Sequence, residues 1–301
     1  MRVLITGVSG FVGRHVVRRL LAEGDRVSAT YWGDNPSVPG VELFEADIED
    51  RDQLARVVER TRPEAVIHLA GLSHVGESWN RPGDYFRVNV LGTENVLRAA
   101  RGTRVLVASS AEVYGAVPED EQPIPEEQPV APGSPYALTK AAAERLAVAL
   151  GDGRAVIVRS FNLVGAGQAL RFALPSFAAQ LAAIRAGRSE PVIRVGNLSA
   201  RRDFVHVAAA AEAYALLAHR GEGGGVYNLA SGRALSIAEA LDRLIRISAV
   251  EACPETDPAR LRPVDQPLLV GDAGRLEAMG WCAEPGVDRA LEDLWKEAAS
   301  L

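Results

Sequence analysis

Short apolar runs alternate with amphipathic segments through the first half of the chain, and this alternation restricts the possible folds strongly. A right-handed crossover through a helix returns the chain beside its previous strand, so repeated strand and helix segments predict a parallel sheet covered on both faces. We therefore expect a doubly wound α/β domain. The expected strands are Arg2–Thr6, Arg26–Tyr31, Val41–Glu45, Ala65–Leu69, Arg104–Ala108 and Ala155–Arg159, and the expected helices between them include Phe11–Ala22, Arg51–Arg60 and Phe86–Ala100.

The rhythm changes after about residue 160, where longer helical stretches are separated by loops marked with proline. This pattern predicts a second, smaller and mainly helical unit. Folds of this type bind ligands in a cleft at the carboxyl edge of the sheet, so we expect the site between the two units. The expected helices of this half are Phe172–Ala186, Val207–His219 and Ile237–Ile247.

Composition excludes several classes of function. The 301 residues carry a net charge of −6 without a cluster of Lys and Arg, which argues against nucleic acid as a partner. The longest uncharged stretch, Phe172 to Ile184, is too short for a transmembrane helix, and a first strand at residues 2–5 leaves no room for a leader. Cys253 and Cys282 are too far apart for a redox or metal motif, so we expect a cytoplasmic protein without a metal site.

Three glycines, Gly7, Gly10 and Gly13, lie between the first expected strand and the first expected helix. Their spacing differs from the usual GxGxxG fingerprint, but the physical requirements are the same. A tight turn and a close approach of the backbone direct the amino terminus of a helix toward a pyrophosphate. The segment therefore predicts a dinucleotide cofactor site.

The ends of the second and third strands bear on the cofactor's identity. Asp47 ends the third expected strand, where it either accepts a hydrogen bond from an adenine amino group or caps the helix at 51–60. The second strand ends in Ala29-Thr30-Tyr31-Trp32, without the acid that holds the ribose hydroxyls of NAD. This absence favours NADP, with NAD as the alternative, although the nearest basic residue is Arg14.

Tyr136 and Lys140 lie one turn apart on the helix expected at 136–150. A phenol with a pKa near 10 becomes a useful proton carrier when a cation stabilises its anion. The chain holds only two lysines, which makes the second residue of this pair conspicuous, although a surface pair on a helix is the alternative. Ser110, after the fifth expected strand, is placed to bind a substrate oxygen beside Tyr136, whereas the preceding Ser109 suits the capping of a turn.

Together with His68-Leu69-Ala70-Gly71, Asn89-Val90-Leu91-Gly92-Thr93 and Arg202-Asp203-Phe204, these motifs resemble the extended short-chain dehydrogenase/reductase family of sugar-nucleotide enzymes over nearly the whole chain. The resemblance implies a Rossmann-like dinucleotide-binding domain at 1–160, to which about 203–229 returns, and a sugar-nucleotide-binding domain at 161–202 and 230–301. It also implies cofactor contacts from Gly7, Gly10, Phe11, Val12, Gly13, Asp47, Ile48, Leu69, Ala70, Gly71, Asn89 and Phe161.

The same resemblance assigns roles to the catalytic group. Tyr136 is the implied acid and base, Lys140 holds the nicotinamide ribose and tunes Tyr136, and Ser110 orients the C4 oxygen of the sugar. Hydride passes to or from C4 of the nicotinamide in this family. Its members usually pair through the helices expected here at 86–100 and 136–150, so we expect a homodimer. His68, at a buried strand end, is expected to serve packing.

Motifs in the second half resemble the branch that holds GDP-mannose 4,6-dehydratase and GDP-4-keto-6-deoxy-D-mannose reductase. They run over 160–168, 195–204 and 261–265. By this resemblance Arg202 and Arg262 hold the substrate diphosphate, Asp265 the ribose hydroxyls and Asn162 the sugar phosphate, while Ser73 contacts the substrate. The alternative for Arg202 is an internal ion pair with the adjacent Asp203.

Two neighbouring residues distinguish the reactions of this branch. Glu112 matches the catalytic base of the dehydratases, but the related reductases also keep a glutamate. Ala111 stands where the dehydratases carry Asp or Ser, and a methyl group cannot donate a proton to a departing hydroxyl. We therefore expect NAD(P)H-dependent reduction of the C4 ketone of a GDP-4-keto-6-deoxy-hexose, which forms GDP-D-rhamnose. The alternatives are GDP-mannose 4,6-dehydratase and a 4-epimerase of a UDP- or dTDP-sugar.

Overall fold

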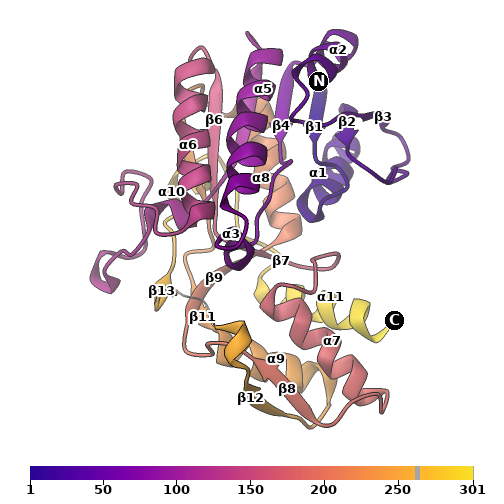
Figure 1. Ribbon diagram of the computed structural model, residues 1–301, viewed down its shortest axis with the longest axis vertical. Helices are drawn as coiled ribbons and strands as arrows, with labels where there is room; N and C mark the ends of the chain where they lie inside the picture. The colour runs from indigo at the N-terminus through magenta and orange to yellow at the C-terminus, as the bar shows by residue number, and fades with distance from the viewer. Residues whose placement is uncertain (262–264, 301) are drawn as a thin grey trace.

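A seven-stranded parallel sheet forms the centre of the larger unit in the computed structural model, which describes residues 1–261 and 265–300 (Figure 1). Its strand order is β10-β6-β5-β4-β1-β2-β3. The chain adds β2 and β3 on one side of β1 and then β4, β5, β6 and β10 on the other side, as in doubly wound folds. The expected fold class is confirmed. The strands are β1 (Arg2–Thr6), β2 (Arg26–Tyr31), β3 (Glu42–Glu45), β4 (Ala65–His68), β5 (Arg104–Ser110), β6 (Ala155–Ser160) and β10 (Val226–Leu229).

Helices cover both faces of this sheet. On one face, α1 (Phe11–Ala22) packs against α8 (Val207–Arg220), and on the other, α2 (Arg51–Thr61) and α6 (Pro135–Leu150) pack against α5 (Gly92–Ala99). The helix expected at 86–100 is divided, because a π-helical turn, η1 (Arg87–Leu91), precedes α5. The connections hold the short elements α3 (Val75–Ser78), α4 (Pro82–Phe86), η2 (Ala111–Tyr114) and η3 (Glu119–Glu121).

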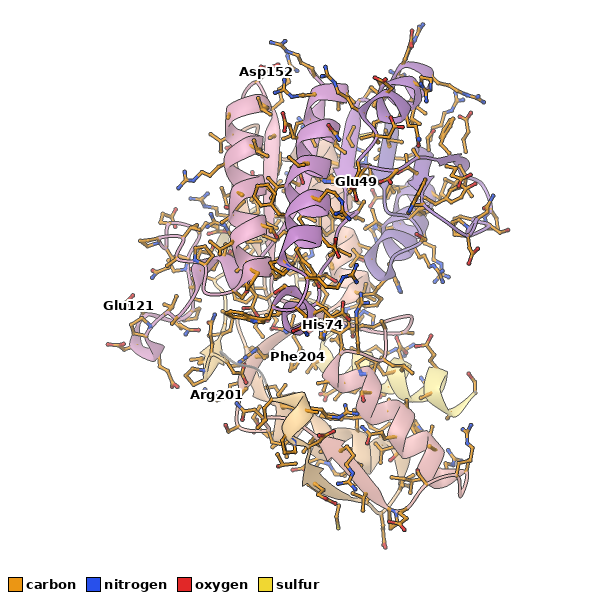
Figure 2. All side chains as sticks on the ribbon, in the orientation of Figure 1. Glu49, His74, Glu121, Asp152, Arg201 and Phe204 are labelled. Atoms are coloured by element: carbon orange, nitrogen blue, oxygen red, sulfur yellow. The ribbon has the colours of Figure 1, made fainter. Side chains whose placement is uncertain are left out.

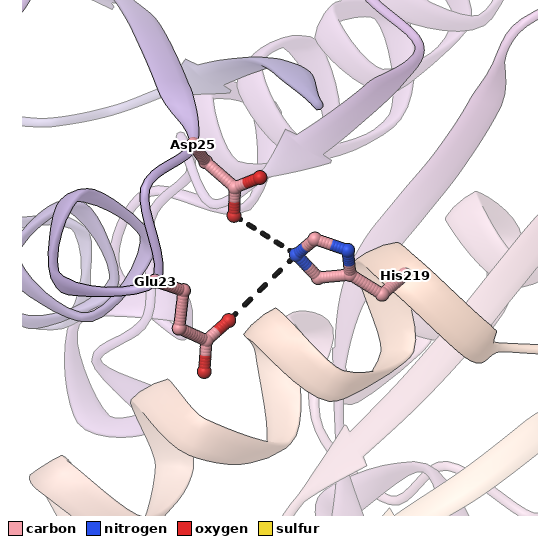
Figure 3. A group of neighbouring side chains, drawn as sticks. All are labelled: Glu23, Asp25 and His219. Atoms are coloured by element: carbon pink, nitrogen blue, oxygen red, sulfur yellow. Dashed lines mark hydrogen bonds and ion pairs between the residues drawn. The ribbon is translucent and has the colours of Figure 1, made fainter.

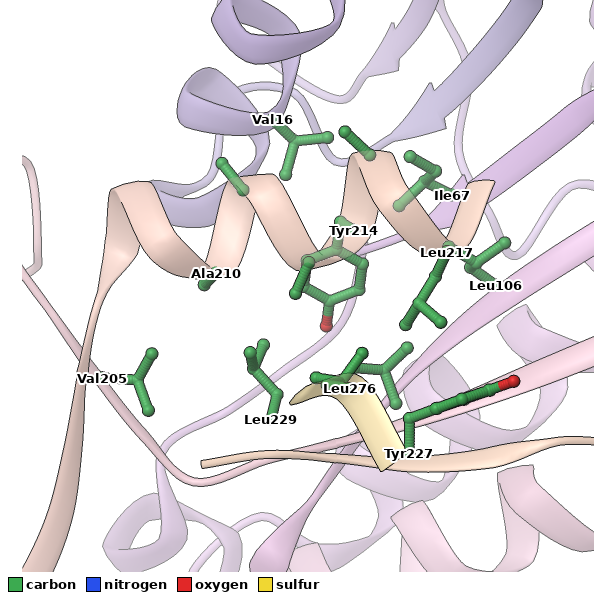
Figure 4. Packing of buried hydrophobic residues seen from close by; sticks show 14 of the residues in the cluster. Val16, Ile67, Leu106, Val205, Ala210, Tyr214, Leu217, Tyr227, Leu229 and Leu276 are labelled. Atoms are coloured by element: carbon green, nitrogen blue, oxygen red, sulfur yellow. The ribbon is translucent and has the colours of Figure 1, made fainter. Parts of the chain in front are cut away.

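The core beneath α8 explains why that distant segment joins the first unit. Tyr214 and Leu217 point from α8 toward the sheet, and Val16 of α1 packs on the same helix (Figure 4). Each of these side chains is buried. The strand that follows, β10, extends the sheet beyond β6; its four residues carry too weak a period for sequence reasoning to have found it.

The smaller unit combines helices with short strands, so it is less helical than the sequence suggests. Its core is formed by apolar faces of α7 (Ala173–Arg185), α9 (Ile237–Ser248) and α11 (Val287–Ala299). Several strands are only two to four residues long, which hides them from pattern analysis. Strand β9 (Arg201–His206) pairs with β7 (Asn162–Val164), β11 (Ala234–Ser236) and β13 (Leu268–Leu269), while β8 (Val192–Val195) pairs with β12 (Cys253–Thr256).

The segment 269–281, which was expected in the second domain, packs with the first unit. Leu269, Leu276 and Trp281 belong to the hydrophobic cluster beneath α8, and the Trp281 indole donates a hydrogen bond to the Ala209 carbonyl at 2.9 Å. Helix α10 (Gly274–Ala278) lies against β10. The boundaries expected at 230 and 301 therefore do not describe the packing of this segment.

Candidate functional site

Two glycines of the loop between β1 and α1, Gly7 and Gly13, cannot carry a side chain without displacing backbone. Gly7 has φ +80°, and a Cβ there would lie 2.7 Å from the Ala70 amide nitrogen. A Cβ on Gly13 would lie 2.5 Å from the Gly7 carbonyl oxygen. Helix α1 begins after Gly10 without a side-chain cap, so its first amide groups remain available to a ligand. This is the arrangement that binds phosphate at a helix amino terminus.

A cavity of about 490 Å³ opens at this loop and reaches the ends of β5 and β6. Ser110, Tyr136 and Lys140 line it together with Glu112, so the structure brings the four expected catalytic residues to one space. The expected cofactor residues that line the same cavity are Gly7, Gly10, Phe11, Val12, Gly13, Leu69, Gly71 and Phe161, and Ser73 and Asn162 line it from the substrate side.

Tyr136 stands in the first turn of α6, whose amino terminus is capped by Ser134. Its side chain is 6% exposed and packs edge-on against Tyr85, with the ring centroids 6.3 Å apart. Burial raises the pKa of the phenol above its ordinary value, while a hydrogen bond with Ser110 acts in the opposite direction. The phenol is therefore protonated at neutral pH, and the pair is not an exposed surface feature.

Lys140 lies one turn further along α6, with its ammonium group held from the sheet. The Nζ atom donates a hydrogen bond to the Ala108 carbonyl oxygen at 2.8 Å. Burial lowers the pKa of this ammonium to about 8, and the charge of Glu144 opposes the shift. Lys140 is thus a cation at neutral pH that loses its charge in mildly alkaline solution.

The turn after β5 is capped by Ser110 and not, as the sequence had suggested, by Ser109. Ser110 accepts a hydrogen bond from the Glu112 amide at 3.2 Å and so caps η2, the role that the sequence suggested for Ser109. Ser109 instead donates to Glu144 at 2.5 Å. The reason is strand alternation, which directs neighbouring side chains of β5 to opposite faces of the sheet.

Four expected cofactor residues lie outside the lining of this cavity. Ala70 packs against Gly7, and Ile48 is buried against Gly92. Asn89 holds the loop after β4 through both its amide atoms, which bond to the Leu72 backbone at 2.8 and 3.0 Å. The remaining residue, Asp47, lies just beyond β3.

Asp47 does not cap the helix that follows it. The cap of α2 is Asp50, whose carboxylate accepts hydrogen bonds from the amides of Asp52 and Gln53. Asp47 accepts a hydrogen bond from the Glu49 amide at 2.9 Å and remains partly exposed at the end of β3. The capping alternative is therefore wrong, and the contact with adenine stays a prediction.

His68 is a buried histidine with a partner for each ring nitrogen. Nδ1 lies 2.7 Å from the Thr6 hydroxyl, and Nε2 lies 3.0 Å from the Thr93 hydroxyl. The Thr93 hydroxyl donates its own proton to the Asn89 carbonyl, so Nε2 carries the ring proton. Burial and the charge of Lys140 lower the pKa of His68 to about 3. His68 thus joins β1, β4 and α5 as a neutral side chain, which agrees with its expected structural role.

Replacing His68 with Gln should weaken the protein's response to acid. The pKa is lower in the folded chain than in the unfolded chain, so its contribution to stability is present above pH 6.5 and is lost as pH falls toward 3. One such group gives a slope of at most about 1.4 kcal/mol per pH unit. Urea unfolding of wild type and variant between pH 7 and 5 measures this slope. An unchanged slope would contradict the assignment.

A second cavity, of about 540 Å³, continues from the first between the two units. Both share the wall formed by Asn162, Leu163, Gln168, Arg171 and Phe172. Figure 2 labels His74 and Phe204, two lining residues of the second cavity that lie where the units meet. Its expected substrate residues are Asn162, Arg202 and Asp265.

Arg202 pairs with Asp265 rather than with the adjacent Asp203. The guanidinium Nη2 lies 2.5 Å from the Asp265 carboxylate, and Nη1 donates to the Gln266 carbonyl at 2.8 Å. Asp203 points to the other side of β9 and is fully buried, where it accepts hydrogen bonds from Ser231. The alternative of an internal ion pair between Arg202 and Asp203 is therefore wrong, and the contact of Arg202 with a substrate diphosphate stays a prediction. Arg262 lies outside the described residues.

Sequence reasoning missed the residues that separate the two cavities. Gln168, Arg171 and Phe172 line both, although only the first belongs to a motif quoted above. Phe172 packs edge-on against His74 at 5.6 Å, and Arg171 lies 4.0 Å from Glu77, so this loop meets α3 of the larger unit. The position of this loop could have indicated them, because it connects the end of a strand, close to Asn162, to the next helix, and such loops often carry functional residues.

A carboxylate and histidine cluster lies far from both cavities. Glu23, Asp25 and His219 place their ligand atoms within 4.8 Å of one another (Figure 3). The Asp25 carboxylate binds His219 at 2.9 Å and the amino terminus of Met1 at 2.6 Å, while Glu23 pairs with Arg19. The cluster adjoins the amino end of β2, opposite to the glycine loop. Its carboxylates already have cationic partners, so we assign it no metal.

Two further observations concern the environment of the protein. Cys253 and Cys282 are both unpaired and exposed. Among the residues described, no helix combines the length and the apolar character that a membrane crossing needs.

The fold and the site together define the class of protein. The chain belongs to the NAD dependent epimerase/dehydratase family, whose model matches residues 3–230. It is 38% identical to GDP-6-deoxy-D-mannose reductase from Pseudomonas aeruginosa, over 96% of this chain and 94% of the relative.

Solved structures place the chain in the same group. The structure of RMD from Pseudomonas aeruginosa complexed with NADPH covers 100% of this chain and 99% of its own, with a TM-score of 0.86 and 34% identity. The UDP-glucose 4-epimerase of Thermus thermophilus in complex with NAD covers 99% of each chain, with a TM-score of 0.88 and 32% identity. Both a reductase and an epimerase thus share this architecture.

Proposed function

We propose that this protein is an NADPH-dependent reductase of the C4 ketone of a GDP-4-keto-6-deoxy-hexose, with GDP-D-rhamnose as the product. The observation that carries the proposal is the buried group of Ser110, Tyr136 and Lys140 facing the glycine loop across one cavity, in a chain 38% identical to a GDP-6-deoxy-D-mannose reductase. Identity over nearly the full length of both chains supports the same substrate class.

The first cavity fits a dinucleotide. The glycine loop brings backbone and the free amides of α1 to one end, where a pyrophosphate would bind, and Lys140 lies at the other end for the ribose of the nicotinamide. The reduced nicotinamide, when bound, supplies hydride. No acid ends β2, and Trp32 there is 63% exposed, so the last residues of this strand carry no carboxylate that would repel a 2′-phosphate. We therefore favour NADP and keep NAD as the alternative.

The chain's own residues supply the proton and stabilise the anion that remains after its transfer. As the ketone carbon accepts hydride, its oxygen gains negative charge and needs a proton, which the protonated Tyr136 can donate. Ser110, hydrogen-bonded to Tyr136, orients that oxygen. The phenolate left on Tyr136 is stabilised by the Lys140 cation one turn away, as long as the pH stays below about 8.

The second cavity supplies the place for the nucleotide. Arg202 is buried and already paired with Asp265, so a substrate diphosphate would share the guanidinium with that carboxylate. Asp265 would accept hydrogen bonds from ribose hydroxyls, and Asn162, on the wall between the cavities, would hold the sugar phosphate. Ser73 would reach the substrate from the larger unit.

Dehydration is disfavoured by Ala111, which is buried in the wall of the first cavity beside Glu112. Its methyl group cannot protonate a leaving hydroxyl. A 4-epimerase is the second candidate, because the epimerase structure from Thermus thermophilus covers the whole fold at 32% identity.

The test is to mix the purified protein with freshly generated GDP-4-keto-6-deoxy-mannose and NADPH, then with NADH, and to follow the nicotinamide absorbance. We expect rapid loss of absorbance with NADPH and a slower loss with NADH. Tight substrate binding without loss in either mixture would overturn the proposal. Incubation with UDP-glucose and retained NAD, followed by analysis of the sugar, then tests the epimerase.

We also propose that the protein is a cytoplasmic homodimer. Phe86, Leu91, Leu138 and Val148 are between 43% and 65% exposed, and they lie on or beside the helical segments expected to pair. Large apolar side chains gathered on two adjacent helices suit a symmetric partner. Light scattering at micromolar concentration should give twice the monomer mass of 32.1 kDa, and a monomeric mass would refute the dimer.

A further inference from the structure

A second polar group lies directly beneath the catalytic residues. Ser109 donates a hydrogen bond to Glu144 at 2.5 Å, and the same carboxylate accepts two hydrogen bonds from Arg159, at 3.0 and 2.7 Å. The three residues are only 5–6% exposed. None of them carries a role in the proton transfer described above, although Ser109 lines the cavity.

This group connects the elements that carry the catalytic residues. Glu144 stands on α6, one turn after Lys140, and Ser109 stands on β5 between Ala108 and Ser110. The Ala108 carbonyl is the acceptor of the Lys140 ammonium. A bond between Ser109 and Glu144 therefore fixes both the anchor of Lys140 and the position of Ser110 relative to α6.

The last residues of β5 are held by few backbone hydrogen bonds, so a side-chain contact matters for their position. Strand β4 stops at His68, opposite Val107, so among the described strands the last three residues of β5 have a neighbour on one side only. That neighbour is β6, where Arg159 lies directly opposite Ser109. The short stretch that carries Ser110 is thus held by backbone pairing from one side and by Glu144 from α6.

We infer that Glu144 is a positioning residue, which through Ser109 holds the end of β5 against α6 and thereby sets Ser110 relative to Tyr136 and the Ala108 carbonyl relative to Lys140. The inference rests on the proposed function of Tyr136 and Lys140. It assigns Glu144 no contact with substrate or cofactor.

The charge of Glu144 gives this role a measurable signature. The ionised group that acts on Lys140 is Glu144, on the same helix α6. His68 of β4 faces the Lys140 ammonium as a neutral ring. Glu144 opposes the fall in the Lys140 pKa that burial causes. Removing the negative charge should therefore lower the pH at which the reductase loses activity through deprotonation of Lys140.

The alternative is that Glu144 and Arg159 form an ion pair that serves stability only. The hydrogen bonds around this pair allow the positioning role and the purely structural role to be tested separately. Arg159 has further support, since it donates to the Glu126 carbonyl at 3.0 Å and lies 4.8 Å over the Tyr114 ring. Removing only the Ser109 hydroxyl leaves the pair of Glu144 and Arg159 intact. Ser109→Ala thus tests the fixation of β5 without leaving a buried charge unpaired.

The experiment compares Ser109→Ala and Ser109→Thr with the wild type in the reductase assay. We expect the alanine variant to lose about tenfold or more in kcat, because small misplacements of reacting groups have large effects on rate, with KM nearly unchanged. The threonine variant keeps the hydroxyl and should recover most of the rate. Ser248→Ala, which removes a buried hydroxyl from α9 in the other unit, is the control and should keep the wild-type kcat.

Glu144→Gln supplies the second measurement. The amide oxygen can still accept from Ser109 and from Arg159 Nε, so the variant keeps the bond to β5 while it removes the charge and the hydrogen bond from Arg159 Nη2. The alkaline limb of the pH profile should move to lower pH. Glu126→Gln, a change at a buried carboxylate outside the catalytic group, should leave that limb unmoved. If Glu144→Gln does not fold, the two Ser109 variants decide the question alone.

The outcomes separate this inference from the proposed function. A wild-type protein inactive as a reductase overturns the proposed function, and the same variants are then compared in the epimerase assay, which uses the same residues. Wild-type kcat in Ser109→Ala, with a loss of thermal stability only, overturns the inference. Reduced kcat in Ser109→Ala that Ser109→Thr does not recover also overturns it.

Discussion

Replacing Tyr136 with Phe should lower kcat by a factor of about 10³, within the range that general acid catalysis contributes to enzymes. The substitution removes one oxygen atom and keeps the ring that packs against Tyr85. The fold and the affinity for NADPH should therefore be close to those of the wild type. Steady-state kinetics with the ketone substrate measure the loss, and fluorescence titration measures cofactor binding.

Tyr227→Phe is the matched control for this experiment. Its phenol accepts a hydrogen bond from the Glu222 amide at 3.1 Å, at the edge strand β10 and outside both cavities. We expect this variant to keep the wild-type rate. Substantial residual reduction by the Tyr136 variant would show that the proton comes from another group, and the assignment of the acid would then be wrong.

Replacing Gly7 with Ala should have the largest effect on cofactor binding. The new methyl group would meet the Ala70 backbone at 2.7 Å, and the residue would be forced to keep a φ of +80°. Overpacking costs about 1–3 kcal/mol and a left-handed conformation costs about 1–2 kcal/mol. Because the loop must move, we expect NADPH affinity to fall by about tenfold or more, since each 1.4 kcal/mol corresponds to a factor of ten.

Gly24→Ala separates the two contributions to that loss. Gly24 has φ +83°, nearly the same as Gly7, but nothing lies within 4 Å of its Cβ position. This variant should lose about 1–2 kcal/mol of stability through backbone strain alone and should bind NADPH normally. Equal loss of cofactor affinity in both variants would mean that close packing against Ala70 does not shape the site.

Much of this architecture follows from local sequence patterns. Helix α1 and strands β1 and β2 have the expected bounds, because each combines a clear apolar period with glycine or charge at its ends. The glycine loop and the pair of Tyr136 and Lys140 were predicted from short spacings, Ser110 was predicted from its place after a strand, and the structure brings them to one cavity. The resemblance to a family then supplied the substrate residues.

Other features depend on contacts between distant segments, which a local pattern does not contain. The pairing of Arg202 with Asp265 joins residues 63 positions apart, and the adjacent Asp203 was a reasonable but wrong partner. The task of Ser109 depends on Glu144, which the sequence shows only as an acid four residues after Lys140. Strand β10 joins the sheet through a tertiary contact with β6 rather than through its own period.

The path of the chain also determines when its first unit can be completed during synthesis. The core beneath α8 draws on Val16 and Ile5 near the start, and on Tyr214 and Trp281 far along the chain. A nascent chain that ends after β6 lacks β10 beside that strand and lacks α8 over the apolar face of α1. The ribosome must therefore release almost the entire polypeptide before this core closes, and a fragment ending at 160 should be a client of chaperones rather than a stable nucleotide-binding module.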